Sequence, residues 1–153
     1  MDAFDRKILG LYQTDTRRPA ESIGESVGLS AAAVQRRLKR LREAGVIRGE
    51  IASLDATALG FPVICVLMLT LASRPSPRAQ LDRFKREIGA EPMVQQCYQV
   101  TGSADLVLIV AAPSMEAYAA FVRRRIEGDE AVARFDTFVV LDAVKIGLSL
   151  PLP

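Results

Sequence analysis

The side chains best suited to chemistry in this sequence lie in residues 30–45. Arg36, Lys39 and Arg40 carry charges that can neutralise phosphates. Gln35 and Arg36 belong to the residue types that pair bidentately with adenine and guanine. At about 100° per residue, the basic side chains project from the side opposite an apolar arc, which holds Ala31, Val34, Leu38 and Leu41. The segment is therefore predicted to be a helix with a buried seam and a basic outer face.

The ends of this helix, and the segment before it, are also marked in the sequence. Ser30 is a good N-cap, and Gly45 suits the left-handed position that ends a helix. Residues 20–27 form a second, short amphipathic helix, followed by a tight turn at residues 27–29. Two helices across a short Gly-containing turn are typical of a helix-turn-helix, whose second helix can enter the major groove of DNA. The alternative is an ordinary solvated basic face, but the order of these features favours the helix-turn-helix.

Length and composition set the remaining bounds. The 153 residues, half of them hydrophobic, suit one domain or two small ones. Cys65 and Cys97 lie in apolar or strand-like runs, so we expect buried thiols rather than a disulfide or a metal site. The N-terminus is charged from Asp2 onward, and the longest apolar run, residues 61–72, is too short to span a bilayer. A cytoplasmic protein without a membrane partner is expected.

The distribution of charge is more informative than the net charge of +2. Residues 1–55 hold ten Lys and Arg against eight Asp and Glu, whereas residues 56–153 hold ten of each. Half of the ten N-terminal basic residues fall on the one predicted helix: Arg36, Arg37, Lys39, Arg40 and Arg42. Positive charge therefore forms a local patch rather than a basic tail.

The first half contains one further helix and a connection. Helical spacing of apolar residues predicts a helix over residues 4–13 that covers the helix pair. Residues 46–55 alternate loosely, which predicts a strand or wing. Residues 56–62, with Gly60 and Pro62, form the predicted hinge between two domains.

The second half changes period and alternates strands with helices. Strands are predicted at residues 63–71, 93–101, 106–112 and 133–145, and helices at residues 77–88 and 114–126. This β-α-β-β-α-β order is the split βαβ, ferredoxin-like arrangement, with an antiparallel sheet and both helices on one face. The fold class is therefore α+β. Residues 63–71 are apolar on both sides, so the uncovered face predicts a homo-oligomer.

These features together resemble the leucine-responsive/asparagine-operon (Lrp/AsnC, feast/famine) regulators. The resemblance covers nearly the whole chain and is carried by residues 1–9, 27–30, 37–49, 100–105 and 137–145. It implies a winged helix-turn-helix reader of double-stranded DNA at residues 1–50, a linker at 51–61 and a ferredoxin-like effector-binding and oligomerisation domain at 62–153. It further implies homodimers formed through the sheets, an octamer of four dimers, and an amino acid or related small molecule bound between dimers.

The family's DNA contacts, carried over by resemblance, fall on the recognition helix. They assign Ser30, Arg37 and Lys39 to phosphates, and Ala32, Gln35 and Arg36 to base edges. Lys39 and Arg40 can exchange roles with these residues. For Arg37, a structural ion pair on the helix flank remains an equal alternative.

By the same resemblance, an effector would bind near the turn at residues 100–105. Gly102 allows close backbone approach to a ligand carboxylate, and Asp105 can pair with an ammonium group. The other predicted effector-binding residues are Tyr98, Thr101, Ser103 and Thr137. Where the family commonly has an acidic residue and then an aromatic, this chain has Ser103 and Ala104, so the pocket differs. The alternative is an ordinary hairpin turn.

Two other classes of function are compared with this interpretation. Sirohaem decarboxylases share the architecture and rely on histidine, but this chain has no histidine, and no nucleophile-base pair, metal-ligand cluster or phosphate-cradling Gly loop is evident. We therefore predict no enzymatic activity, no metal and no cofactor other than a small-molecule effector. The third class is a ligand-binding oligomer without specific DNA binding, against which the basic helix argues.

Overall fold

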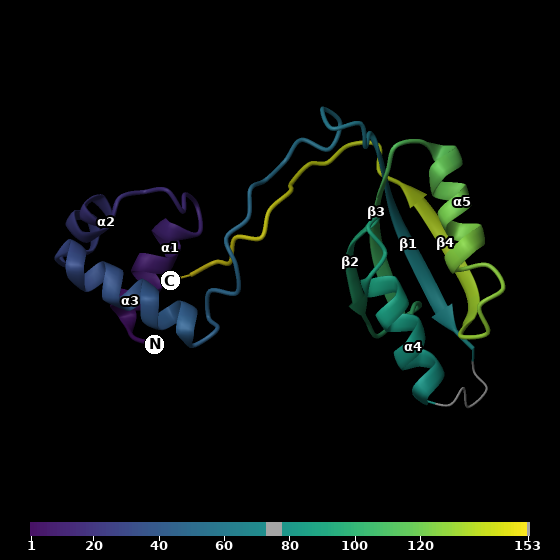
Figure 1. Ribbon diagram of the computed structural model, residues 1–153, viewed down its shortest axis with the longest axis horizontal. Helices are drawn as coiled ribbons and strands as arrows, with labels where there is room; N and C mark the ends of the chain where they lie inside the picture. The colour runs from purple at the N-terminus through teal and green to yellow at the C-terminus, as the bar shows by residue number, and fades with distance from the viewer. Residues whose placement is uncertain (73–77, 153) are drawn as a thin grey trace. The chain divides into compact units, whose positions relative to one another are not determined.

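The computed structural model describes residues 1–72 and 78–152 and divides into two compact units. The second unit is Leu54–Val144, and the first combines Met1–Ser53 with the segment that begins at Lys145. In Figure 1 the first unit holds the purple and blue helices, and the second holds the sheet. Each unit has a hydrophobic core of its own.

The first unit is a three-helix domain with α1 at Ala3–Tyr12, α2 at Ala20–Val27 and α3 at Ala31–Glu43. The predicted helices are confirmed to within about one residue at each end. The Ser30 hydroxyl accepts a hydrogen bond from the amide of Ala33 at 3.2 Å, as expected of an N-cap. Gly28 ends α2 with a φ of 75°, a left-handed conformation that favours glycine. The capped helix pair across this turn is the predicted helix-turn-helix.

The three helices bury one apolar cluster and bring α2 very close to the start of α3. The cluster consists of Ile8, Tyr12, Ile23, Val27, Val34 and Leu38. Gly24 lies where the backbone of α2 meets the turn: its carbonyl accepts from the amide of Leu29 at 2.9 Å. A Cβ at this position would lie 2.4 Å from the carbonyl oxygen of Leu29. Only glycine therefore allows this approach without a backbone shift.

The second unit is the predicted α+β domain. Its elements are β1 at Val63–Leu71, α4 at Arg78–Gly89, β2 at Val94–Gln99, β3 at Leu106–Ala112, α5 at Met115–Arg125 and β4 at Val132–Val139. The strand order is β2-β3-β1-β4, and all three strand pairs are antiparallel. The ferredoxin-like order is confirmed; residue 77, the predicted start of the first helix, lies outside the described residues.

Both helices cover the same face of the sheet (Figure 1). Alternate residues of β1, namely Cys65, Leu67 and Leu69, are fully buried in a cluster with Phe84 of α4 and Phe121 of α5. The intervening residues of β1 point to the open face. On the same face, Tyr98 of β2 is 51% exposed and Phe138 of β4 is 55% exposed. The open face thus presents large apolar side chains to solvent.

Two predicted strands differ in the structure. Residues 46–55 form no strand, because the described residues offer this segment no pairing partner; only Ile47 packs on the helical core. The last strand ends at Val139, and residues 140–145 continue without a ladder beyond one bond from Val140 to Ile64. The sequence pattern overextended both because alternation marks an extended chain, not a paired one.

The last segment departs from the predicted domain division. We expected residues 62–153 to form one domain, but the segment from Lys145 groups with the helical unit. The backbone of Leu150 exchanges two hydrogen bonds of 2.9 Å with the side-chain amide of Gln13. Along the described parts of the chain, no helix is long and apolar enough to cross a membrane.

Candidate nucleic-acid interface and effector region

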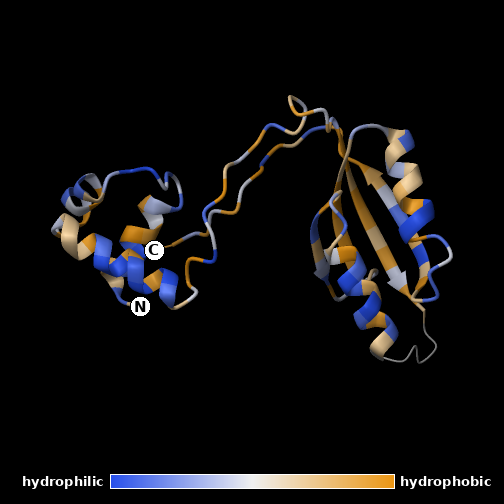
Figure 2. Cartoon of the chain, viewed as in Figure 1, coloured by the Kyte–Doolittle hydropathy of each residue, from blue (hydrophilic) through white to orange (hydrophobic). Residues whose placement is uncertain are grey.

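The outer face of α3 carries the predicted base-reading residues, and all of them are exposed. Ala32, Gln35 and Arg36 point to solvent on the side opposite the buried residues of this helix. Lys39 continues the same face one turn later and approaches Glu43 at 3.8 Å. Figure 2 shows α3 as apolar in its first turn and largely hydrophilic after that. Within the helical unit, this face of α3 is open to a ligand.

The flank of α3 that faces α1 has a different role. Arg37 donates to Asp2 at 2.7 Å and to Asp5 at 2.8 Å, and its side chain is 24% exposed. The guanidinium of Arg40 donates to both carboxylate oxygens of Asp5, at 2.8 and 2.7 Å, while its side chain stays 59% exposed. Arg37 also lies 5.6 Å from the centre of the Phe4 ring, in cation–π geometry. The structural ion pair considered for Arg37 is thus present.

Asp5 is the buried acid of this cluster. It is completely buried, and each of its oxygens accepts hydrogen bonds, including one from the Asp2 amide at 3.0 Å. Burial alone would raise the pKa of Asp5, but the bonds from Asp2 and Arg37 and the charge of Arg40 together lower it. Asp5 is therefore ionised at neutral pH.

Next to this cluster, a cavity of about 330 Å³ opens along α3. It is lined by Leu29, Ala33, Arg36, Arg37 and Arg40. The cavity contains three guanidinium groups, of which two are held by acids of α1. Such a lining attracts anions, and arginine presents its donors in a fork that matches a phosphate.

Arg42, the fifth basic residue of α3, points back into the helical unit. It donates to Glu50 at 2.9 Å and to the hydroxyl of Tyr12 at 2.7 Å, and it lies over the Tyr12 ring. The hydrogen bond with Tyr12, and then the one from Arg42, lower the pKa of Glu50. Arg42 therefore ties the end of α3 to α1 and to the following segment.

The predicted effector residues do not converge on one surface. Tyr98 stands opposite Val107, and Thr137 stands opposite Leu67, so the two side chains project from opposite faces of the sheet. Thr137 lies on the helix side, where its hydroxyl is 2.7 Å from the hydroxyl of Tyr118. No single cavity of one chain can therefore hold both side chains. Side chains alternate between the two faces along each strand, but the faces of Tyr98 and Thr137 could be assigned only once the register of the strands was known.

The turn between β2 and β3 holds the other four predicted residues. Thr101, Gly102 and Ser103 are exposed, and Gly102 has a φ of 130° with open space where a Cβ would lie. Asp105 extends the sheet: its amide donates to the carbonyl of Leu69 at 2.8 Å, and its carboxylate accepts from the amide of Leu71 at 2.7 Å. Asp105 thus has a structural role in the turn beside any contact with a ligand.

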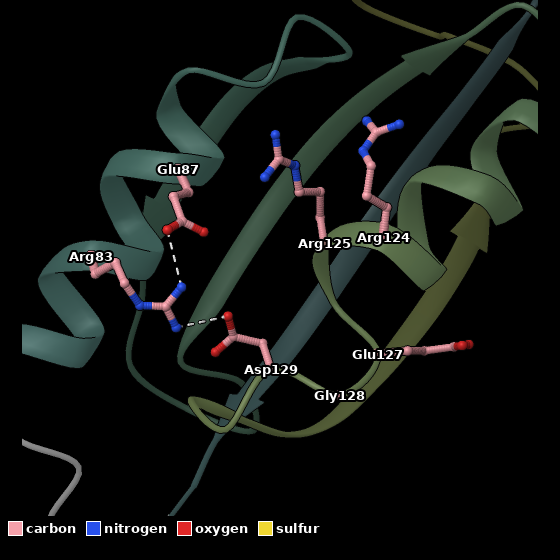
Figure 3. A pocket seen from close by; sticks show the side chains of 7 residues that line it. All are labelled: Arg83, Glu87, Arg124, Arg125, Glu127, Gly128 and Asp129. Atoms are coloured by element: carbon pink, nitrogen blue, oxygen red, sulfur yellow. Dashed lines mark hydrogen bonds and ion pairs between the residues drawn. The ribbon is translucent and has the colours of Figure 1, made fainter.

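A second cavity, of about 230 Å³, lies beside α4 and α5 and includes none of the predicted residues. Arg83 bridges Glu87 at 3.0 Å and Asp129 at 3.1 Å (Figure 3). Arg124 and Arg125 also line it, and both donate to Glu91, which is buried. The lining of this cavity combines three arginines with three acids.

The thiols and the acidic groups of the described residues show no metal site. Cys65 is buried as predicted, but the prediction is wrong for Cys97, which is exposed. Cys97 lies on β2, an edge strand paired only with β3, so it has less cover. Within the described ranges, no group of three or more Cys, Asp and Glu side chains is placed to hold a metal ion.

Sequence reasoning missed the roles of Asp5 and Gly24. Acids at the start of a helix are already favoured by the helix dipole, so their presence in α1 does not indicate a partner on α3. Arg37 and Arg40 lie three residues apart, so both fall on one helix flank, and this spacing was the available signal for a shared acidic partner. For Gly24, a glycine inside a short helix was a signal of close backbone approach.

Two family models match the sequence. The AsnC-type helix-turn-helix domain matches residues 1–42, and the Lrp/AsnC ligand binding domain matches residues 65–150. An uncharacterized HTH-type transcriptional regulator of Sinorhizobium fredii is 39% identical over 153 residues, covering 99% of this chain and 89% of the relative. The match to this relative extends over both units.

Solved structures agree with the family models. The crystal structure of an AsnC family transcriptional regulator from Agrobacterium tumefaciens is similar with a TM-score of 0.89 and 32% identity, covering 99% of this chain and 97% of that one. The complex of a Neisseria meningitidis transcriptional regulator with L-Met has a TM-score of 0.88 and 27% identity, with coverage of 99% and 97%. The chain therefore belongs to the Lrp/AsnC family of helix-turn-helix transcriptional regulators, which are not enzymes.

Proposed function

We propose that this protein regulates transcription by placing α3 in the major groove of a pseudo-palindromic operator. The observation that carries the proposal is the exposed row formed by Ala32, Gln35, Arg36 and Lys39. In this assignment Gln35 and Arg36 hydrogen-bond to base edges, Ala32 contacts a base by van der Waals packing, and Lys39 binds a phosphate. A DNA-binding regulator works where the chromosome is, which supports a cytoplasmic location.

Phosphate contacts flank this row. Ser30 lies at the N-terminus of α3, where free amides and the helix dipole favour an anion. Arg40 is exposed beside the cavity along α3 and is assigned to the DNA backbone. Arg37 is less exposed and is held by two acids, so its contribution to DNA binding comes second to its ion pairs.

The second part of the proposal is an amino-acid effector. It is supported by the ligand-binding domain match and by the complex of the Neisseria meningitidis relative with L-Met. We assign ligand contacts to the turn residues Thr101, Gly102, Ser103 and Asp105, together with Tyr98 on the open face. Thr137 is left out of the ligand contacts because its hydroxyl is bonded to Tyr118 on the other face.

The third part is a homodimer formed through the open faces of two sheets, with an octamer of four dimers as the larger assembly. The exposed Tyr98 and Phe138 support it, because apolar patches of this kind are usually covered in solution. Two recognition helices related by a two-fold axis can then read half-sites about one helical turn apart. A ligand bound between dimers would favour one assembly and change the spacing of these helix pairs on DNA.

A DNA-binding selection on the purified protein tests the proposal, repeated with each of the twenty amino acids while light scattering follows the assembly size. Enrichment of a palindrome, with affinity or size altered by one amino acid, is the expected result. Binding that enriches no sequence and disappears at moderate salt contradicts specific reading, and the ligand-binding oligomer then becomes the better interpretation.

Two substitutions separate base reading from phosphate binding on the selected duplex. Arg36→Ala is expected to cost roughly 1–3 kcal/mol of binding free energy and to relax sequence preference. Lys39→Ala is expected to weaken binding to all sequences alike. An Arg36→Ala protein that keeps the full specificity of the wild type overturns the assignment of Arg36.

A further inference from the structure

Two arginines of the recognition helix, Arg37 and Arg40, are held in place by acids at the start of α1. Asp5 is completely buried and accepts hydrogen bonds from Arg37 at 2.8 Å and from Arg40 at 2.8 and 2.7 Å. Asp2 adds a bond to Arg37 at 2.7 Å. Asp2 is the N-cap of α1 and Asp5 lies in its first turn, whereas Ile8 and Tyr12 of the same helix pack in the apolar core. A charged element of α1 thus reaches the flank of α3.

Arg40 keeps donors available after it has bound Asp5. All of its hydrogen bonds within the described residues come from one terminal nitrogen, Nη2, and its side chain is 59% exposed. A guanidinium has five N–H donors in a rigid fork, so those on Nε and Nη1 remain for a second partner. Arg40 also lines the cavity along α3 together with Arg36. A phosphate oxygen that entered this cavity would meet donors of fixed direction.

Fixing a side chain before binding increases affinity because the loss of rotamer freedom has already occurred in folding. Arginine has many rotamers, so this gain is large for it. The cluster nevertheless has a cost, because Asp5 and Asp2 bring negative charge near a surface that must approach DNA. The two effects predict opposite outcomes when Asp5 loses its charge.

We propose that Asp5 is a positioning residue of the DNA interface, which holds Arg40, and with Asp2 also Arg37, so that the free donors of Arg40 bind a backbone phosphate beside the recognition helix. This inference rests on the proposed DNA-binding function and extends it to α1. Asp5 itself touches no DNA; it acts through the two arginines.

Asp5→Asn tests the proposal, because the amide keeps the size of the side chain and an acceptor oxygen but removes the charge. The probe is the duplex recovered by selection on the wild-type protein. If positioning dominates, Asp5→Asn weakens binding by about tenfold, and the slope of log affinity against log salt becomes shallower by about one phosphate contact. If removal of negative charge dominates, binding becomes equal or tighter, and the proposal is overturned.

Asp15→Asn is the matched control for the charge change. Asp15 lies in the same unit, its side chain is 54% exposed, and within the described residues its carboxylate contacts only Arg17. The variant makes the same change in net charge without touching α3, so its affinity is expected to equal or slightly exceed that of the wild type. A loss equal to that of Asp5→Asn would remove the argument for positioning.

Arg40→Ala keeps the test decisive even if Asp5→Asn does not fold, as judged by circular dichroism. The proposal expects Arg40→Ala to reduce the salt slope by about one, and an unchanged slope overturns it. The double variant Asp5→Asn/Arg40→Ala should bind almost as well as Arg40→Ala. The small further loss expected is the effect of Asp5 through Arg37. Full additivity of the two losses means that Asp5 does not act through Arg40.

The proposed function and this inference fail in different ways. A wild-type protein that enriches no sequence contradicts the proposed function itself. A wild-type protein that reads its operator, with an Asp5→Asn variant that reads it equally well, contradicts only the positioning role.

Discussion

Among the described residues, each unit of the molecule buries one carboxylate and surrounds it with two arginines. In the helical unit the acid is Asp5, with Arg37 and Arg40. In the α+β unit it is Glu91, with Arg124 and Arg125 at 3.1 and 3.0 Å. Both acids are less than one-tenth exposed. Burial acts to raise the pKa of each, but it is outweighed at Asp5 by the bonds from the Asp2 amide and Arg37, and at Glu91 by the bonds from Arg125 and Arg124. Locally, the two clusters solve the same problem of keeping a buried acid ionised.

The surroundings of the two clusters differ. Beside Asp5, the cavity along α3 adds a further arginine, Arg36, and no acid. Beside Glu91, the cavity near α4 and α5 adds Arg83 but also three acids, Glu87, Glu127 and Asp129. Of these two cavities, the one along α3 is the one whose lining is left with an excess of positive charge. A buried ion cluster is a structural device in both units, and the charge that its neighbours leave unbalanced indicates where an anion can bind.

The largest effect on stability is expected at Gly24, in the helical unit that carries the Asp5 cluster. Gly24→Ala places a Cβ 2.4 Å from the carbonyl oxygen of Leu29 and forces α2 and α3 apart. We expect a loss of about 2–3 kcal/mol in the free energy of unfolding, measured by urea denaturation. DNA affinity should fall together with stability, since α3 carries Arg37 and Arg40 of the Asp5 cluster.

Gly10→Ala provides the matched control for Gly24→Ala. Gly10 lies in α1, and a Cβ there meets nothing within 4 Å. Alanine favours helix more than glycine does, so this variant should be as stable as the wild type or more stable, by up to about 1 kcal/mol. Equal losses in the two variants would mean that close approach of the backbones is not the cause.

A smaller effect is expected from the cluster of the α+β unit. Glu91→Ala removes charge-assisted hydrogen bonds and should cost about 2 kcal/mol of unfolding free energy. The loss is moderate because Arg124 and Arg125 are 55% and 38% exposed and can regain water. The salt slope of DNA binding should not change. A slope that fell as in Asp5→Asn would break the distinction between the two clusters.

Acid titration compares the two carboxylates directly. Because the folded pKa values of Asp5 and Glu91 are lowered from 3.8 and 4.5, their stabilisation is complete above these ordinary values and is lost as pH falls through the folded values. Urea midpoints should therefore decline below about pH 5. Asp5→Asn and Glu91→Gln should each flatten the decline. A curve as steep as that of the wild type contradicts the assignment for that residue.

The smallest effect is expected at the mixed-charge rim of the second cavity. Arg83 pairs with Glu87 and Asp129, but its side chain is 43% exposed, and exposed pairs contribute little to stability. Arg83→Ala should leave the urea midpoint within experimental error. A clear loss of stability would show that this rim is part of the structural cluster around Glu91.

Much of the fold was predictable from local pattern. The Ser30 cap, the left-handed Gly28 and the apolar arc of α3 define the helix-turn-helix through interactions between residues close in sequence. The bounds of β1 and β3 matched the prediction because both are continuous apolar runs buried on the helix side. The predicted end of β4 failed because pairing depends on a neighbouring strand, which alternation alone does not reveal.

The candidate site was predictable in part for the same reason. Exposure of Gln35 and Arg36 follows from helical periodicity on one element. The Asp5 cluster joins residues 32 and 35 positions apart, and no period in the sequence connects them. The opposite orientations of Tyr98 and Thr137 depend on the register of four strands. Contacts between distant segments thus set the limit of the sequence prediction.

The bond between Gln13 and Leu150 has a consequence for the order of events during synthesis. The two residues are 137 positions apart, and the whole α+β unit is encoded between them. A ribosome releases the chain from its N-terminus, so α1, α2 and α3 can pack long before Leu150 has been translated. The side-chain amide of Gln13 is therefore hydrated until the second unit and Leu150 have been synthesised. The helical unit is the first to begin folding and the last to be completed.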